Sequence, residues 1–149
     1  MATANGRRDE ARVTQLFCAS YRAYRPDWGQ AVVTSLGLPR WRLAEAEQWP
    51  RAWVITPTAE LLGEPDPAKY AAGYRARLER FGVPKIARTL ERIATDFEAD
   101  RLVLLCHESD WSRCHRKLIA EFWLSVTGEM ITELAEAAPD DVQPPLFPQ

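Results

Sequence analysis

The chain has 149 residues, of which 46% are hydrophobic and 27% are charged, and its formal net charge is −2. This length predicts one globular domain that buries a hydrophobic core. The small net charge excludes a protein that binds nucleic acid or a membrane surface through its overall charge alone. No apolar run is long enough to span a bilayer, and the N-terminal sequence MATANGRRDE contains no apolar signal segment.

The cysteines and the local distribution of charge add to this description. Three cysteines, an odd number, argue against a disulfide framework and for a reducing compartment, so we expect a soluble, cytoplasmic protein. Five arginines and one acid, Asp27, lie between Arg12 and Arg42, whereas the segment from Glu121 to the C-terminus has six acids and no base. The chain is therefore locally basic near its start and acidic near its end.

The first part of the chain predicts strands. Residues 1–11 are polar and predict a frayed start. Three short runs that are rich in apolar and β-branched residues follow, and each predicts a strand. These runs are Val13–Cys18, Ala31–Leu36 and Ala52–Thr56, the last of which is stopped by Pro57.

Two helices are predicted next. Tyr70, Tyr74, Leu78 and Phe81 recur at helical spacing, and Gly82 predicts the end of the first helix. Pro84 predicts the start of the second helix. The apolar stripe of this second helix consists of Ile86, Leu90, Ile93 and Phe97.

A strand, a third helix and an edge strand complete the predicted elements. Leu102–Leu105 is apolar at every position, as expected of a central strand that is covered on both faces of a parallel sheet. The helix begins near Ser112 or Arg113 and ends at Gly128. Its predicted buried side consists of Leu118, Ile119, Phe122, Trp123 and Val126. Residues 129–134 alternate weakly and predict an edge strand.

These elements predict the fold class. Strands mixed with helices of this length are typical of an α/β fold, here a single layered domain with a mostly parallel central sheet flanked by helices. We assign residues 1–138 to this domain. Residues 139–149, PDDVQPPLFPQ, are rich in proline and acid, and they predict a flexible, disordered tail that does not join the core.

The most reactive residue types gather in LLCHESDWSRCHRKL, residues 104–118, between the predicted central strand and the third helix. Ligands of open α/β sheets bind outside the carboxyl ends of the strands, where the N-termini of helices face them. Such a helix start offers N–H groups and a partial positive charge. Arg113 and Arg116 add full charges and bidentate geometry. The simplest interpretation is an anion-binding corner.

Three chemistries remain open at this corner. In the first, Glu108 is a general acid/base or an electrostatic stabiliser beside the bound anion. In the second, Cys106 or Cys114 is a thiolate nucleophile favoured by the helix start and the nearby cations. A phosphatase or rhodanese signature has its arginine one residue earlier than Arg113, which argues against the thiolate.

In the third chemistry, zinc is bound by Cys106, His107, Cys114 and His115. Adjacent Cys-His pairs seldom converge on one metal, and this spacing matches no standard zinc finger, so we expect neither structural zinc nor another cofactor. Simple packing is the alternative for each residue alone, because free cysteine is often buried and His115 fits a core histidine. The cluster as a whole favours a functional site.

LLCHE and CHRKLIAEFW together resemble the family known as domain of unknown function 488, whose signature is an apolar strand, then Cys-x-Glu, then Cys-His-Arg at the start of a helix. Four further segments are similar to this family: TSLGLPRW, VITPTAELL, YAAGYRARLERFGVPKIARTL and TGEMITEL. The resemblance covers Val13–Leu134 and implies an α/β fold with a common site, but no established reaction.

Carried over to this chain, the recurrent polar positions of the family are Cys106, Glu108, Cys114, His115 and Arg116, followed by Ser35, Arg40 and Tyr74. His107 departs from the family, in which this position is often aromatic.

Two segments suggest a partner. SYRAYRPDWGQ and LPRWR interleave arginines with tyrosine and tryptophan, a pattern that suits a nucleotide or a single strand, although an aromatic core with arginines lying around it explains the pattern equally well.

The tail contains QPPLF, and its Gln143, Leu146 and Phe147 resemble the peptide by which bacterial replication and repair proteins bind the sliding clamp. Pro144 and Pro145 depart from that peptide because they stiffen it.

The leading hypothesis is an enzyme, a hydrolase or glycosylase, that acts on a nucleotide or nucleic acid at a glycosidic or phosphate group. We assign catalysis to Glu108, Cys106 and His115. Substrate binding is assigned to Arg113, Cys114, Arg116, Ser35, Arg40 and Tyr74. Two alternatives stay open: a non-catalytic DNA-associated accessory or sensor recruited to the clamp by its tail, and a cysteine-thiolate enzyme or sensor that uses Cys106.

Overall fold

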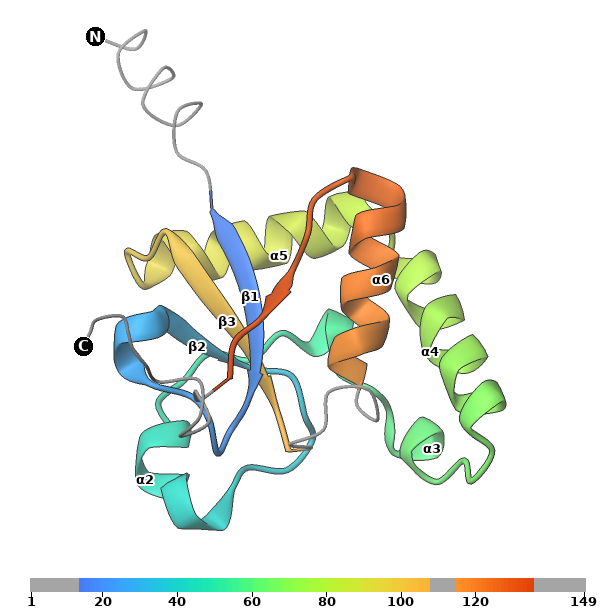
Figure 1. Ribbon diagram of the computed structural model, residues 1–149, viewed down its shortest axis with the longest axis horizontal. Coiled ribbons are helices and arrows are strands. Elements are labelled where there is room, and N and C mark those ends of the chain that lie inside the picture. The colour runs from blue at the N-terminus through green and yellow to red at the C-terminus, as the bar shows by residue number, and fades with distance from the viewer. Residues whose placement is uncertain (1–13, 108–114, 136–149) are drawn as a thin grey trace, which may run out of the picture.

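A computed structural model of the chain describes residues 14–107 and 115–135 (Figure 1). Within these residues the strands form one sheet in the order β2-β3-β1-β4, and every neighbouring pair is parallel. The strands are β1 (Gln15–Ser20), β2 (Gln30–Val33), β3 (Arg101–Cys106) and β4 (Thr132–Glu133). The predicted α/β fold with a parallel central sheet is therefore confirmed, with β3 between β2 and β1 and β4 at an edge.

The long helices agree with the glycine and proline signals. They are α4 (Pro67–Phe81), α5 (Val83–Asp96) and α6 (His115–Thr127). Gly82 separates the first two with φ +83°, and Gly128 follows the third with φ +80°, values that favour glycine over residues with a side chain. Short helical segments complete the described elements: η1 (Pro26–Trp28), η2 (Arg40–Arg42), α2 (Leu43–Ala46), η3 (Trp53–Ile55) and α3 (Ala59–Leu62).

The strand predicted over Ala52–Thr56 is wrong. The chain reaches the sheet only through one parallel bridge between Val33 and Arg51, and the next residues turn into η3. Ala52 still donates its N–H to the carbonyl of Val33 at 3.0 Å, but the N–H of Ile55 already donates back to Ala52 at 3.2 Å. Arg77 on α4 donates to two carbonyls of this turn, so tertiary contacts override the β propensity of the run.

Two residues predicted to be buried are exposed instead. Phe97 is 43% exposed because α5 ends at Asp96 and Phe97 lies beyond its last turn. Val126 is 55% exposed on the last turn of α6. Both cases are ends of an apolar stripe that extends past the core.

The core lies on both faces of the sheet because successive side chains of a strand point to opposite sides. Cys18, Val32, Leu102 and Leu104 face α4, α5 and α6, which lie together on the right and at the back in Figure 1. On the other face, Ala19, Ala31, Val33, Val103 and Leu105 pack against Tyr21, Tyr24 and Trp49. No helix among the described residues combines the length and apolar character needed to cross a membrane.

The strand register places the candidate site. Ser20 at the end of β1 lies opposite Cys106 at the end of β3, and Val33 at the end of β2 lies opposite Leu105. The carboxyl ends of these strands therefore meet at one edge of the sheet, the lower end in Figure 1, where α6 also begins. The predicted helix start near Ser112 and the predicted tail, residues 139–149, lie outside the described residues.

Candidate functional site at the carboxyl edge of the sheet

Polar residues follow each of the inner strand ends. The N–H of Tyr21 donates to Cys106 at 2.9 Å, and the N–H of Thr34 donates to Leu105 at 3.1 Å, so the ladder continues one residue beyond β1 and β2. This continuation fixes Thr34 and Ser35 at the edge, and both are buried. His115 begins α6 at the same edge.

His115 is held by Thr34. The Thr34 hydroxyl donates to the carbonyl of Leu105 at 2.7 Å, and its oxygen lies 3.0 Å from Nε2 of His115. A hydroxyl has one hydrogen, so Thr34 accepts from His115 and the imidazole carries its proton on Nε2. Thr34 was missed by the sequence reasoning, because its partner lies 81 positions away and the intervening chain gives no signal of the contact.

The environment of His115 keeps its imidazole neutral. Burial lowers the pKa of His115 from 6.5 to about 4, a hydrogen bond with the backbone of Thr34 opposes this shift, and the positive charge of Arg116 adds to it. Tyr74 closes one side, with its ring 5.6 Å from the imidazole in an edge-on arrangement. At neutral pH His115 is thus a hydrogen-bonding group rather than a cation.

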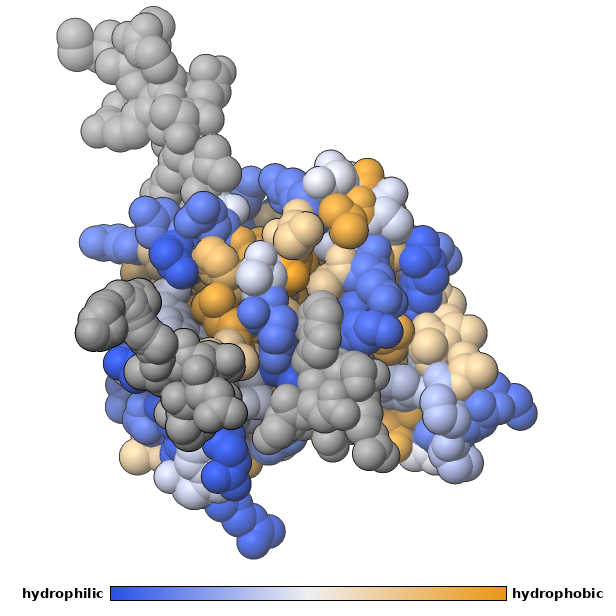
Figure 2. Space-filling view, viewed as in Figure 1, coloured by the Kyte–Doolittle hydropathy of each residue, from blue (hydrophilic) through white to orange (hydrophobic). Residues whose placement is uncertain are grey.

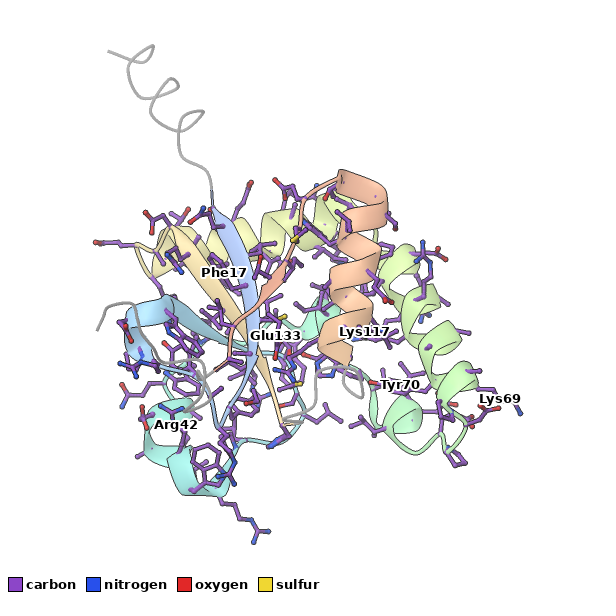
Figure 3. The ribbon with its side chains drawn as sticks, in the orientation of Figure 1. Phe17, Arg42, Lys69, Tyr70, Lys117 and Glu133 are labelled. Atoms are coloured by element: carbon purple, nitrogen blue, oxygen red, sulfur yellow. The ribbon has the colours of Figure 1, made fainter. Side chains whose placement is uncertain are left out.

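Arg116 lies inside the protein. Its side chain is fully buried, and its guanidinium donates through one terminal nitrogen to Oε2 of Glu133 on β4 at 3.0 Å. Cys18 on β1 donates its thiol to the other carboxylate oxygen at 3.3 Å. Figure 3 shows Glu133 between the sheet and the first turns of α6. One buried cluster therefore links β1, β4 and α6.

Burial also dominates the titration of this cluster. Burial raises the pKa of the Glu133 carboxyl above its usual value, although the Arg116 charge and the bonds to Cys18 and Arg116 lower it in part. Burial raises the pKa of the Cys18 thiol far beyond its usual range, and the negative charge of Glu133 adds to this shift. Cys18 is consequently inert as a thiolate, and Glu133 is a carboxylate that the sequence reasoning did not single out.

The loop after β2 ties Ser35 to His107. Ser35 donates its hydroxyl to the carbonyl of Gly37 at 2.7 Å, so Tyr21 donates to Ser35 across their 2.6 Å contact. His107 donates from Nε2 to the same carbonyl of Gly37 at 2.9 Å. Its exposed imidazole lies 4.9 Å from the ring of Tyr21. His107 thus fills the place of an aromatic residue, which explains why it is compatible with a position that is often aromatic in the resembling family.

The other predicted substrate-binding residues that the structure describes, Tyr74 and Arg40, differ in burial. The hydroxyl of Tyr74 donates to the carbonyl of Ile55 at 2.6 Å, and the side chain is fully buried. Tyr74 therefore supports His115 from within the core. Arg40 is exposed at the start of η2. Glu108, Arg113 and Cys114 lie outside the described residues, and so do Gln143, Leu146 and Phe147 of the tail.

Cys106 corrects one expectation from the cysteine count. The odd number of cysteines argued against disulfides, but Cys106 is disulfide-bonded in this structure. Its side chain is also buried at the end of β3. In this state its sulfur is neither a thiolate nor a metal ligand.

No group of three or more metal-ligating side chains is positioned to hold an ion in the part of the chain that the structure describes. The Nε2 atom of His115 contacts Thr34, and that of His107 contacts Gly37. The absence of structural zinc stays a prediction for the complete chain.

We expect both described cysteines to resist alkylation. Cys18 is buried and protonated, and the sulfur of Cys106 is bonded, so iodoacetamide at pH 7.5 should modify each at least about 100-fold more slowly in the folded protein than after unfolding and reduction. Peptide mapping by mass spectrometry measures the rate at each position. Rapid labelling of Cys106 in the folded protein would restore the thiolate hypothesis.

The fold and the site define a class: an α/β protein with a parallel sheet whose carboxyl edge holds a buried histidine and arginine at the start of a helix. The family described as Domain of unknown function DUF488 matches residues 45–123, more than half of the chain, and the chain belongs to this family. The match includes Cys106, Glu108, Cys114, His115 and Arg116, whereas Ser35 and Arg40 precede it. Neither the curated proteins nor the solved structures contain a match to this chain.

Proposed function

We propose that the protein is an enzyme that acts on a nucleotide or nucleic acid, at a glycosidic or phosphate group, at the carboxyl edge of the sheet. The observation that carries the proposal is the placement of neutral His115 and charged Arg116 at the beginning of α6, beside the ends of β1, β2 and β3. This edge is where open parallel sheets bind their ligands.

The electrostatics favour an anionic ligand. The described first turn of α6 contains no acid. The helix has 13 residues, which is long enough to give its N-terminus a positive partial charge. Arg116 adds its charge from inside the protein, where its contact with Glu133 holds it in place. Because Glu133 offsets part of this charge, we assign direct contact with a phosphate group to Arg113 rather than to Arg116.

The low pKa of His115 limits the acid/base role that this residue can take. His115 is a weak base with a pKa of about 4, so at neutral pH it suits orientation of a substrate by hydrogen bonding better than proton uptake. Proton transfer is then assigned to Glu108, which follows β3 by two residues. The thiolate alternative is weaker, because Cys106 is disulfide-bonded. Recruitment to a sliding clamp through Gln143, Leu146 and Phe147 stays a prediction.

The test combines ligand binding with product analysis. Nucleoside monophosphates should raise the melting temperature, and nucleosides without phosphate should bind at least about tenfold more weakly, because an anion site needs the charge. Labelled oligonucleotides distinguish the two reactions: hydrolysis at a phosphate group breaks the strand directly, whereas base release leaves a site that breaks only in alkali. Glu108→Gln should keep nucleotide binding and lower the rate by about 10²- to 10⁴-fold.

Glu121→Gln is the matched control, since this carboxylate lies one turn further along α6 than Lys117, is exposed, and forms an ion pair with Lys117. It should leave both binding and rate unchanged. The proposal fails if no phosphate-bearing nucleotide stabilises the protein and no oligonucleotide is converted. A Glu108→Gln protein that keeps the full rate would remove the role assigned to Glu108.

A further inference from the structure

Trp41 presents an indole to solvent at the same edge of the protein. It lies in η2 and is 60% exposed, although the neighbouring aromatic residues Tyr21 and Tyr24 are buried. The arginine-aromatic segments of the sequence therefore divide into two parts. Tyr21 and Tyr24 belong to the core, whereas Trp41 has most of its surface outside it.

Arginines surround this indole. The guanidinium of Arg42 lies 5.7 Å from the ring centroid of Trp41 and donates to the carbonyls of Tyr21 and Tyr24 at 2.7 and 3.1 Å. Arg42 also pairs with Glu45, so it is fixed on the protein and its charge is partly neutralised. Figure 3 shows Arg42 beside α2. Arg42 therefore holds Trp41 against the protein, and the positive charge available to a ligand belongs to other arginines.

Arg22 and Arg40 supply that charge. Arg22 lies 5.9 Å from the ring centroid of Trp41, and Arg40 precedes Trp41 in the chain. Both are exposed, and neither forms an ion pair with any residue that the structure describes. Two cations beside an exposed aromatic ring match a ligand that joins phosphate groups to flat bases.

Topology places this surface next to the candidate site. Arg22 follows the end of β1 by two residues, and the loop after β2 leads through Gly37 to Arg40. Figure 2 shows strongly hydrophilic residues projecting from the lower end of the molecule, which is the carboxyl end of the sheet in Figure 1. Gly37 accepts from His107 at this edge, so the same loop joins the two surfaces.

We propose that Trp41, Arg22 and Arg40 form a binding surface for single-stranded nucleic acid, in which one base stacks on Trp41 and backbone phosphates contact the two arginines. The inference rests on the proposed function and names its substrate class. A duplex does not suit the surface, because its bases are already stacked on one another and leave no face for the indole. A mononucleotide would reach the strand-end site without using Trp41.

Fluorescence anisotropy with a labelled oligothymidylate of about 12 nucleotides tests the surface. Trp41→Ala should weaken binding at least about fivefold, because stacking on an aromatic side chain contributes at least about 1 kcal/mol per base. Phe97→Ala is the matched control: Phe97 is also an exposed aromatic residue, but it precedes β3 at the opposite end of the sheet. It should bind as tightly as the wild-type protein.

The arginines have their own measurement. Arg22→Ala combined with Arg40→Ala should reduce the slope of log affinity against log salt concentration by about 1.4, since each phosphate contact on a single strand contributes about 0.7. The double variant Arg88→Ala and Arg92→Ala removes two exposed arginines of α5 and should leave the slope unchanged. A blunt duplex of the same length should bind more weakly than the single strand.

The outcomes separate this inference from the proposed function. Three outcomes would each overturn the binding surface. They are binding of the oligonucleotide by Trp41→Ala as tightly as by wild type, an unchanged salt slope in the Arg22→Ala and Arg40→Ala double variant, and no binding of the oligonucleotide by the wild-type protein. Oligonucleotide binding that depends on Trp41, without conversion of any substrate, would support the surface and refute the enzyme. Mononucleotide affinity should be the same in Trp41→Ala and wild type, and circular dichroism checks that each variant is folded.

Discussion

Glu133→Gln is expected to lower the free energy of unfolding by about 3 kcal/mol or more. The substitution removes a carboxylate from Arg116, whose side chain is fully buried and keeps its charge. A buried charge that loses a partner carboxylate costs far more than an exposed ion pair contributes. Urea unfolding followed by tryptophan fluorescence measures the change.

The two partners should respond unequally. Arg116→Met leaves Glu133, whose side chain is 20% exposed and whose pKa burial already raises, so this carboxyl group takes up a proton more easily. Arg116→Met should therefore lower stability less than Glu133→Gln does. The double variant Arg116→Met with Glu133→Leu should also be more stable than Glu133→Gln. Glu79→Gln breaks the exposed pair with Arg75 and should change stability by less than about 1 kcal/mol. Equal effects of Glu133→Gln and Glu79→Gln would contradict the buried pair.

Stability should fall by about 2 kcal/mol between pH 7 and pH 5 because of His115 alone. The pKa of His115 is about 4 in the folded protein and 6.5 ordinarily, so between these values the unfolded chain binds a proton that the folded protein does not. The unfolded state is therefore favoured as the pH falls through this window. Glu133 acts in the opposite direction, because its raised pKa makes the folded protein bind the proton more readily.

His115→Gln isolates this contribution. The glutamine amide keeps a donor toward Thr34 but does not titrate, so the difference in pH dependence between this variant and wild type belongs to His115. Urea unfolding of both proteins at a series of pH values gives the difference, and NMR titration of the imidazole gives the folded pKa directly. A folded pKa near 6.5, or identical pH profiles, would show that His115 is not buried as a neutral group.

Local signals in the sequence determined most of the fold. An all-apolar run such as Leu102–Leu105 is typical of a strand that is covered on both faces of a parallel sheet, and it is buried in β3. Gly82 and Pro84 set the boundary between α4 and α5. Glycine allows the positive φ that ends the first helix, and proline has a φ that is already suited to the first turn of the second. The same kind of local information failed at Ala52–Thr56, where β-branched residues turn into η3 because distant side chains bind the carbonyls of the turn.

The sequence by itself also placed Cys106 and His107 at the end of one strand, and His115 and Arg116 in the first turn of one helix. Only the tertiary structure decided what these residues do there. Arg116 is a buried partner of Glu133 and Cys18, Thr34 sets the tautomer of His115, and Trp41 is exposed while its aromatic neighbours are not. The reason is physical: the titration and exposure of a side chain depend on burial and on partners brought together by the sheet, and contacts between residues 81 or 115 positions apart leave no periodic pattern in the sequence.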